Sequence, residues 1–377
     1  MPNNSISPDF VSEVQSTVRG TLPSGDNSSI DSGGVAFASL QKLLNEGVNG
    51  GQLFTNPVVS TYSLVYTNVS DAYAGGVLAP NGDIHFIPVS APVGQKVSAA
   101  GVVSTYSLVY TIGALAYAGG VLAPNGDIHF VPFEADRGQK VSATGAVSTY
   151  SLVYTATLAY AGGVLAPNGD IHFVPRNANR GQKVSAAGIV STYSLVYTTL
   201  AGYVGGVLAP NGDIHFIPST ANRGQKVSAA GVVSTYSLVY TIANAYYGGV
   251  LAPNGDIHFI PGSASVGQKI SAAGVVSTYS LVYTTSAGYY GGVLAPNGDI
   301  HFVSWSAPVG QKVSANGVVS TYSLVYTAAS AYTGGVLAPN GDIHFISVRA
   351  NVGQKLTLNT GVNFSKGICM HPYFNKL

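Results

Sequence analysis

The sequence predicts an all-β protein, a seven-bladed β-propeller of four-stranded antiparallel blades. The first observation behind this is a near-identical segment, GGVLAPNGDIHF, that recurs seven times at a spacing of 43 or 44 residues. A fixed period in this range is typical of repeat architectures. The second is that each repeat holds four short runs rich in Val, Ile, Tyr and Thr, bounded by turn residues. The copies begin at Gly75, Gly119, Gly162, Gly205, Gly248, Gly291 and Gly334.

One full unit, residues 119–155, shows where the four strands are expected. Its runs read GGVLAP, DIHFVP, GQKVSATG and AVSTYSLVYT. Asn125 and Gly126 join the first two runs, and Asn-Gly is a strong hairpin signal because both central turn residues accept a positive φ. Gly145 stands between the third and fourth runs. Four antiparallel strands per unit, repeated seven times, predict a closed disc.

The ring has two possible closures. The third-strand signature GQ occurs eight times and the fourth-strand signature VSTYSLVY seven times, so the two chain ends carry one surplus half-blade. Either residues 58–67 complete the last blade, or a degraded copy at residues 361–370 does. We expect the first, because a ring closed by both ends of the chain loses its exposed strand edges.

Residues 1–50 differ in kind from the propeller region, residues 51–377. They are rich in Ser, Asn, Asp and Gly up to about Gly34, which predicts a flexible arm. Phe37, Leu40, Leu43 and Leu44 then share one helical face, which predicts a short amphipathic helix. Two interpretations stay open: a docking peg for a larger assembly, or a helix that lies against the disc.

Composition excludes several partners. Only 8% of residues are charged and the net charge is +1, so nothing favours nucleic acid or an anionic membrane. No apolar run approaches the roughly 20 residues of a membrane span. The N-terminus lacks the basic start and apolar core of a signal peptide, so we expect no conventional export. Cys369 is the single cysteine and forms no intrachain disulfide.

An Asp-x-His pair recurs in every repeat, and we interpret it as architectural. Residues i and i+2 of a strand share a face, so each Asp is expected to reach its His, and the Ser and Tyr of STY to extend the network. Metal binding and acid–base catalysis use such residues, but chemistry is usually done at one site rather than seven. We therefore expect no catalytic residue, metal or cofactor. The pairs are Asp83/His85, Asp127/His129, Asp170/His172, Asp213/His215, Asp256/His258, Asp299/His301 and Asp342/His344.

Two other motifs carry no predicted chemistry. Cys369 lies near His371, but a thiol nucleophile also needs an orienting group and an oxyanion site. The repeated Gly-Gly lacks the Lys-Ser/Thr of a phosphate loop. We expect it where the innermost strands crowd around the central channel and leave no room for side chains.

The differences between copies are the best guide to function. In a four-stranded meander the connections alternate between two faces of the disc. The turns on one face, APNGD and SAAG, scarcely change, whereas both connections on the other face vary. Tyr, Trp and Arg on that variable face are typical anchors of recognition surfaces. The alternative is that the tyrosines pack against the neighbouring blade. The candidate ligand-binding residues are Tyr73, Tyr117, Phe133, Arg137, Tyr160, Arg176, Arg180, Tyr203, Arg223, Tyr246, Tyr289, Trp305 and Tyr332.

The hairpin GGVLAPNGDIHFIP resembles the opening of NHL-type propeller repeats. The whole unit, with its STYSLVY strand and the end NTGVNFSKGICMHPYFNKL, is similar to propeller-repeat proteins encoded by tailed bacteriophages. That resemblance spans roughly residues 51–377. It implies a virion protein, assembled in the host cytoplasm, that serves as a capsid decoration, tail or fibre component and contacts host glycans. Lactonase-type propellers hold a metal near the channel, and no blade supplies an odd acidic residue there.

Two functions follow as hypotheses. The first is a non-enzymatic virion structural and adhesive protein, tethered to other virion proteins by its N-terminal arm, with the variable face outward. The second is a free-standing lectin whose near-identical clefts between blades bind sugars multivalently. A hydrolase or lactonase is the third and least favoured possibility.

Overall fold

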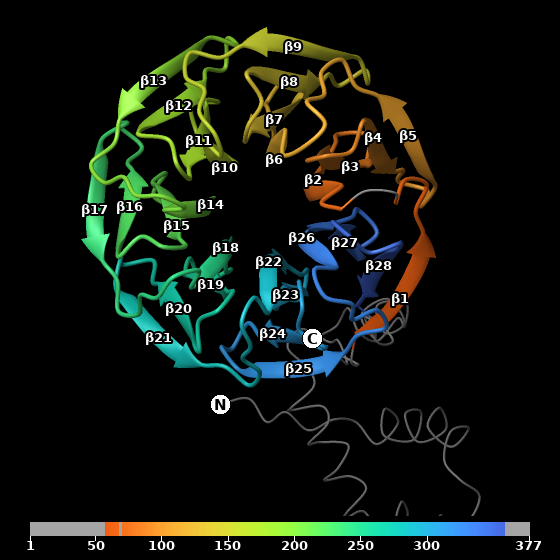
Figure 1. The fold of residues 1–377 in the computed structure, drawn as a ribbon. Coiled ribbons are helices and arrows are strands. Elements are labelled where there is room, and N and C mark those ends of the chain that lie inside the picture. Colours follow the sequence, from red (N-terminus) through yellow and green to blue (C-terminus); the bar gives the residue numbers. More distant parts are fainter. Residues whose placement is uncertain (1–56, 68–69, 359–377) are drawn as a thin grey trace, which may run out of the picture. The chain divides into compact units, whose positions relative to one another are not determined.

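The structure is a computed structural model that describes residues 57–67 and 70–358. Within these residues the chain forms a seven-bladed β-propeller in which every blade is a four-stranded antiparallel sheet (Figure 1). The predicted fold class is confirmed. The expected arm and helix of residues 1–50, the degraded copy at residues 361–370 and the pair Cys369 and His371 lie outside the described residues.

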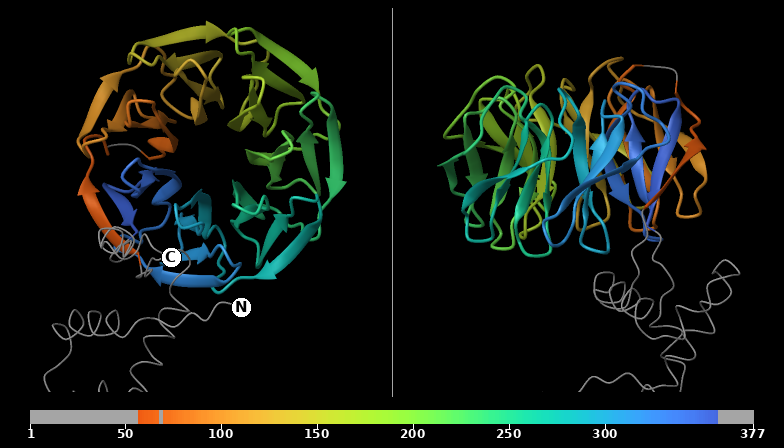
Figure 2. Two further views of the ribbon diagram at one scale, coloured as in Figure 1. Left: turned by 180° about the vertical axis from the view of Figure 1, so that it is seen from behind. Right: turned by 90° about the horizontal axis from the view of Figure 1, so that it is seen from below.

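The blades are numbered 1 to 7 in chain order, and their strands run from the channel outward (Figures 1 and 2). The inner strands are β2 (Tyr73–Leu78), β6 (Tyr117–Leu122), β10 (Tyr160–Leu165), β14 (Tyr203–Leu208), β18 (Tyr246–Leu251), β22 (Tyr289–Leu294) and β26 (Tyr332–Leu337). The second strands are β3 (Ile84–Pro88), β7 (Ile128–Pro132), β11 (Ile171–Pro175), β15 (Ile214–Pro218), β19 (Ile257–Pro261), β23 (Ile300–Ser304) and β27 (Ile343–Ser347).

The outer two layers complete each blade. The third strands are β4 (Val93–Val97), β8 (Arg137–Val141), β12 (Arg180–Val184), β16 (Arg223–Val227), β20 (Val266–Ile270), β24 (Val309–Val313) and β28 (Val352–Thr357). The fourth strands of blades 1 to 6 are β5 (Val103–Ser107), β9 (Val147–Ser151), β13 (Val190–Ser194), β17 (Val233–Ser237), β21 (Val276–Ser280) and β25 (Val319–Ser323).

Blade 7 takes its fourth strand from the other end of the chain. β1 (Val58–Ser63) pairs antiparallel with β28, from Val58 opposite Thr357 to Ser63 opposite Val352. The preferred closure is therefore confirmed. An exposed strand edge is a template for unwanted pairing, and this arrangement leaves blade 7 with the same four strands as its neighbours.

The hairpin between the first two strands differs from the expectation. Of the two turn residues of blade 2, Asn125 and Gly126, only Gly126 has a positive φ, of 85°. The Gly126 amide donates to the Ala123 carbonyl (2.9 Å), and the Ala123 amide donates to the Asp127 carbonyl (2.8 Å). Pro124 holds the position after Ala123 at negative φ, which favours an ordinary turn ending in a left-handed glycine rather than the expected two-residue turn.

The fourth strand is shorter than its sequence signature. In blade 1 it ends at Ser107, and the following Leu108 and Tyr110 pack against the buried cluster of blade 2. The second half of STYSLVYT is thus a segment that joins two blades, here called the tail of the fourth strand. The apolar residues of this tail gave the sequence pattern of a strand. In the structure they are partly buried against the next blade instead of pairing within their own.

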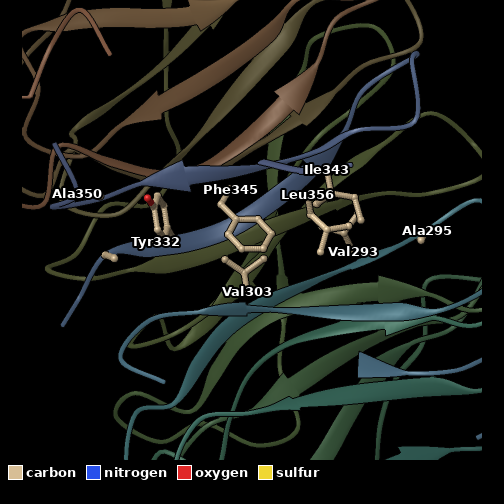
Figure 3. Packing of buried hydrophobic residues seen from close by; sticks show 9 residues of the cluster. Val293, Ala295, Val303, Tyr332, Ile343, Phe345, Ala350 and Leu356 are labelled. Atoms are coloured by element: carbon tan, nitrogen blue, oxygen red, sulfur yellow. The ribbon is translucent and has the colours of Figure 1, made fainter. Parts of the chain in front are cut away.

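The hydrophobic core lies between neighbouring blades. Figure 3 shows the contact of blades 6 and 7, where Val303 of β23 faces Phe345 of β27. Both side chains are fully buried, and equivalent clusters lie between the other blades. Burying such side chains is the main favourable term in folding, so each blade depends on its neighbours for its core.

The inner glycines confirm the predicted crowding at the channel. A Cβ atom on Gly162 would lie 3.0 Å from the Cα atom of Gly205 in the next blade. A Cβ atom on Gly163 would lie 2.8 Å from Val121 of the preceding blade. The Gly-Gly pair is therefore needed for seven inner strands to approach one another, and it has no phosphate-binding geometry.

Ring closure by β1 predicts different effects for two adjacent substitutions. Val59 packs against the cluster of blades 6 and 7, whereas Val58 is 48% exposed. Val59→Asp places a charge in that cluster and is expected to cost about 1–3 kcal/mol of unfolding free energy. Val58→Asp, the matched control, is expected to cost less than about 0.5 kcal/mol. Chemical denaturation measures both; equal costs would contradict closure by β1.

Candidate functional site

The turns of the uniform face are held by the repeated Asp and Lys. In blade 1 the Lys96 Nζ atom lies 2.6 Å from Asp83 Oδ2, and the Ala99 amide donates to Asp83 Oδ1 (3.2 Å). Asp83 is buried, which by itself raises its pKa, but the hydrogen bond and charge of Lys96 lower it overall. The carboxylate therefore ties the first turn of the blade to the third, and the constancy of this face follows from those contacts.

The predicted hydrogen bond between the Asp and the His of each pair is not formed, so that prediction is wrong. In blade 1 the His85 Nδ1 atom lies 3.2 Å from the hydroxyl of Tyr106, the tyrosine of STY in the same blade. Asp83 precedes β3 and faces Lys96 instead, so alternation along a strand does not apply to it. In blade 7 His344 meets Tyr62, which β1 supplies from the other end of the chain (3.1 Å). The network is architectural, but its partners are His–Tyr and Asp–Lys.

These histidines are poorly suited to acid–base chemistry near neutral pH. Burial lowers the pKa of His85 to about 4, and the charge of Lys96 adds to that shift. The other six repeated histidines have the same value, again chiefly through burial. Across residues 57–67 and 70–358, no group of three or more His, Cys, Asp or Glu side chains is placed to hold a metal ion. That region also holds no helix with the length and hydropathy of a membrane span.

The seven predicted tyrosines are not on the surface, which corrects their assignment as ligand-binding residues. The Tyr73 hydroxyl donates to the Val93 carbonyl (3.1 Å), and its ring packs edge-on against Phe86 at 5.7 Å. The alternative interpretation, packing against the neighbouring blade, describes them better, because Tyr73 shares a buried cluster with Val336 and Ile346 of blade 7. Tyr73, Tyr117, Tyr160, Tyr203, Tyr246, Tyr289 and Tyr332 are all at most 1% exposed.

The role of the GQ signature was not apparent from the sequence. Gln95 is fully buried, and its Oε1 atom accepts hydrogen bonds from the amides of Val65 (3.1 Å) and Tyr66 (2.7 Å). These amides belong to the tail of β1, so the bond joins blade 7 to blade 1. Gly94 leaves room for the ring of Tyr106, which a Cβ atom would meet at 2.1 Å. We call the glutamine contact the interblade clasp.

On the variable face the backbone repeats where each loop enters an inner strand, while the side chains change. The residue two positions before each inner strand takes the left-handed conformation whatever its type, for example Leu158 (φ 53°), Asn244 (φ 58°) and Ser330 (φ 57°). Backbone hydrogen bonds such as Ala116 to Val89 (2.7 Å) recur between successive blades. The loops therefore enter the inner strands along one path while presenting different groups to solvent.

Three of the predicted arginines form an arc over blades 2 to 4, here called the arginine arc. Arg137, Arg180 and Arg223 are exposed, and each begins a third strand where other blades have Val. Each guanidinium lies over a tyrosine in the tail of the preceding blade: Tyr110 at 4.8 Å, Tyr154 at 5.2 Å and Tyr197 at 4.9 Å. Arg137 has an acidic neighbour, Asp136, at 3.3 Å, whereas Arg180 and Arg223 bond the amide oxygens of Asn179 and Asn222.

The remaining predicted residues gather nearer the channel with two that the sequence analysis missed. Arg176 lies over the ring of Phe133 at 5.4 Å. Trp305 packs on Tyr290, with ring centroids 4.6 Å apart, and Tyr290 stacks on Tyr247 at 4.0 Å. Blades 5 and 6 read YYGG where other blades have Ala, Val or Thr before Gly-Gly. That doubled tyrosine was the sequence signal that could have identified Tyr247 and Tyr290.

Comparison with known proteins shows the fold and no family. No family model and no curated protein matches the chain. A streptogramin B lyase structure is similar with a TM-score of 0.71 and 21% identity, covering 81% of this chain and 98% of that one. A catalytically inactive histidine-to-alanine variant of virginiamycin B lyase from Staphylococcus aureus with quinupristin has a TM-score of 0.71 and 17% identity, covering 80% and 100%.

An extracellular bacterial domain is also similar. The extracellular domain of a hybrid two-component system from B. thetaiotaomicron matches with a TM-score of 0.63 and 11% identity, covering 82% of this chain and 42% of that one. Propellers with different roles thus share this architecture. At these identities the likeness concerns the fold alone, and function must be argued from the site.

The buried histidines predict a stability that depends on pH. The folded chain keeps them neutral with a pKa of about 4, whereas the unfolded chain binds protons near pH 6.5. Stability should therefore be full above about pH 6.5 and fall as the pH drops toward about 4, by up to about 1.4 kcal/mol per pH unit for each histidine. Thermal unfolding across that range measures it, and His172→Gln should make the fall less steep. A constant midpoint down to pH 4.5 would show that burial does not hold these groups neutral.

Proposed function

We propose that the protein is a non-enzymatic recognition propeller, a virion structural and adhesive component whose variable face contacts host-surface glycans. One observation carries this proposal: seven blades with the same backbone differ mainly in the side chains of one face, and Arg, Trp, Tyr and Phe gather there. These residues are typical energetic anchors of binding surfaces. The virion location rests on the resemblance of the repeat unit to propeller repeats encoded by tailed bacteriophages.

The chemistry of the repeat supports binding rather than catalysis. The repeated Asp residues are engaged by lysines, and the repeated His residues by tyrosines. A catalytic group must be free to reach substrate and exchange protons with it. The lyases that share the fold are under 25% identical, so their activity is not extended to this chain.

The geometry favours a single asymmetric surface over the alternative, a lectin with seven equivalent clefts. Equivalent clefts would need the same exposed groups in every blade. The tyrosine two residues before Gly-Gly is buried in all seven blades. The tyrosine in the tail of the fourth strand is partly exposed, but among the described residues an arginine covers it only at Tyr110, Tyr154 and Tyr197. The exposed aromatic and cationic groups differ from blade to blade: the arginine arc belongs to blades 2 to 4, and Trp305 to blade 6. A ligand that contacts this face would meet one such arrangement per chain.

A glycan array probed with the full chain tests this function. We expect binding to a subset of glycans that falls at least about fivefold in affinity for Arg223→Ala, because a truncated anchor costs more than about 1 kcal/mol. The matched control is Arg349→Ala on the same face. Arg349 is already bonded by Asp71 through two contacts of 3.1 Å, so its charge is committed within the protein.

Two results would count against the proposal. A blank array would remove glycan recognition, leaving at most a structural role. Equal losses for Arg223→Ala and Arg349→Ala would show that the array reads net charge rather than the arginine arc.

A further inference from the structure

Five side chains that break the sevenfold repeat gather on the variable face near the channel. They occupy two positions of the blade: the residue before Gly-Gly on the inner strand, and the first residue after the second strand. Elsewhere these positions hold mostly small or aliphatic residues, including Ala74, Ala118, Ala161, Val204, Ser219, Gly262 and Thr333. We call the five residues the channel cluster: Phe133, Arg176, Tyr247, Tyr290 and Trp305.

Three members of the channel cluster form a stack of aromatic rings. Tyr247 and Tyr290 lie nearly parallel, with centroids 4.0 Å apart and planes at 19°. Trp305 continues the stack from Tyr290, at 4.6 Å and 31°. A Cβ atom on Gly262 would lie 2.1 Å from the ring of Tyr247. Blade 5 thus lacks a side chain at the one position where it would displace the stack, so two departures from the repeat fit each other.

The fourth member, Arg176, is a cation without an anion. Its guanidinium lies over Phe133, and no carboxylate in the part of the chain that the structure describes is within ion-pair distance of it. Its Nε atom is buried and has no hydrogen-bond acceptor among those residues, although the side chain as a whole is only partly buried. A buried donor without an acceptor costs free energy, which an incoming acceptor such as a carboxylate offsets.

Arg176 lies on the same face of the disc as the aromatic stack and holds the same position in its blade as Trp305, the first residue after the second strand. Its charge also acts on the stack. Burial raises the pKa of Tyr290 to about 12 and raises that of Tyr247, and the charge of Arg176 acts against both rises. We therefore treat the five residues as one candidate site.

We infer that the channel cluster binds an acidic sugar, a pyranose that carries a carboxylate. The rings of the stack cover one another's faces, so Trp305 at its end is the ring with a face left for a ligand. A flat aromatic face with a polar edge suits the C–H face of a pyranose. A guanidinium matches a carboxylate in shape and forms paired charge-assisted hydrogen bonds with it. This inference rests on the proposed function and names the class of sugar and the place where it binds.

Trp305 makes the test specific, because it is the single tryptophan of the chain. The full chain is titrated with glucuronic acid or with glucose, which has CH₂OH in place of the carboxylate, and tryptophan fluorescence is recorded. We expect a saturable change with glucuronic acid, half-complete in the millimolar range, and at least a tenfold weaker response to glucose. Arg176→Gln should weaken the glucuronic acid response at least tenfold, and Arg176→Lys less.

Arg349→Lys, on the same face, is the matched control and should leave this titration unchanged, because Arg349 is bonded to Asp71 within the protein. If Arg176→Gln fails to fold, Gly262→Ser gives a second route, because it displaces Tyr247 and should also weaken the response. An equal response to glucose and glucuronic acid, or an unchanged response in a folded Arg176→Gln, would overturn the assignment of a carboxylate.

The titration and the glycan array can fail independently. A silent titration with array binding that depends on Arg223 would overturn this inference and leave the proposed function standing. A specific titration with a blank array would retain the acidic-sugar site and remove the adhesive function. If neither the titration nor the array shows binding, both the acidic-sugar site and the proposed adhesive function are overturned.

Discussion

The interblade clasp is the interaction on which the rest of the structure depends. Each buried glutamine accepts two backbone amides from the tail of the preceding blade, and the set runs from Gln95 through Gln225 to Gln354. Gln95 spans the junction at which the two ends of the chain meet. A buried amide that loses its acceptor costs about 1–3 kcal/mol, so no blade separates from its neighbour without a large penalty. The apolar clusters between blades add to this, because burying apolar side chains is a main favourable term in folding.

A frame held in this way leaves one face free to vary. The uniform face is occupied by turns whose side chains are committed, such as Asp83 to Lys96 and Ala99. The variable face is held by backbone contacts, so its side chains can change without altering the path of the loops. The arginine arc and the channel cluster are such changes. Rigid positioning of a few aromatic and cationic groups is what recognition requires, which connects the architecture with the proposed function.

The period, the turns and the count of signatures were sufficient to predict seven blades and closure by β1. The same features did not predict which residues of different repeats contact one another. Gln95 accepts a hydrogen bond from the amide of Tyr66, which lies 29 residues earlier and in another blade. The repeated Gly-Gln pair does not indicate in the sequence which distant residue it contacts. Tyr73 was assigned to the surface because it adjoins a variable loop, yet it points inward. A register shift between Tyr73 and Gly76 changes the alternation there, so the side of the strand that faces the channel is not readable from period 2 alone.

Hydrogen exchange in Gln225→Met tests the central claim most directly. In the native chain Gln225 accepts the amides of Val196 (3.1 Å) and Tyr197 (2.8 Å). The clasp predicts that both amides exchange at least about fivefold faster in the variant, since an amide left without its acceptor costs about 1–3 kcal/mol. Val325 and Tyr326, held by Gln354, serve as the internal reference. Unchanged exchange at Val196 and Tyr197 in a folded variant would show that the blades are held together by apolar packing alone.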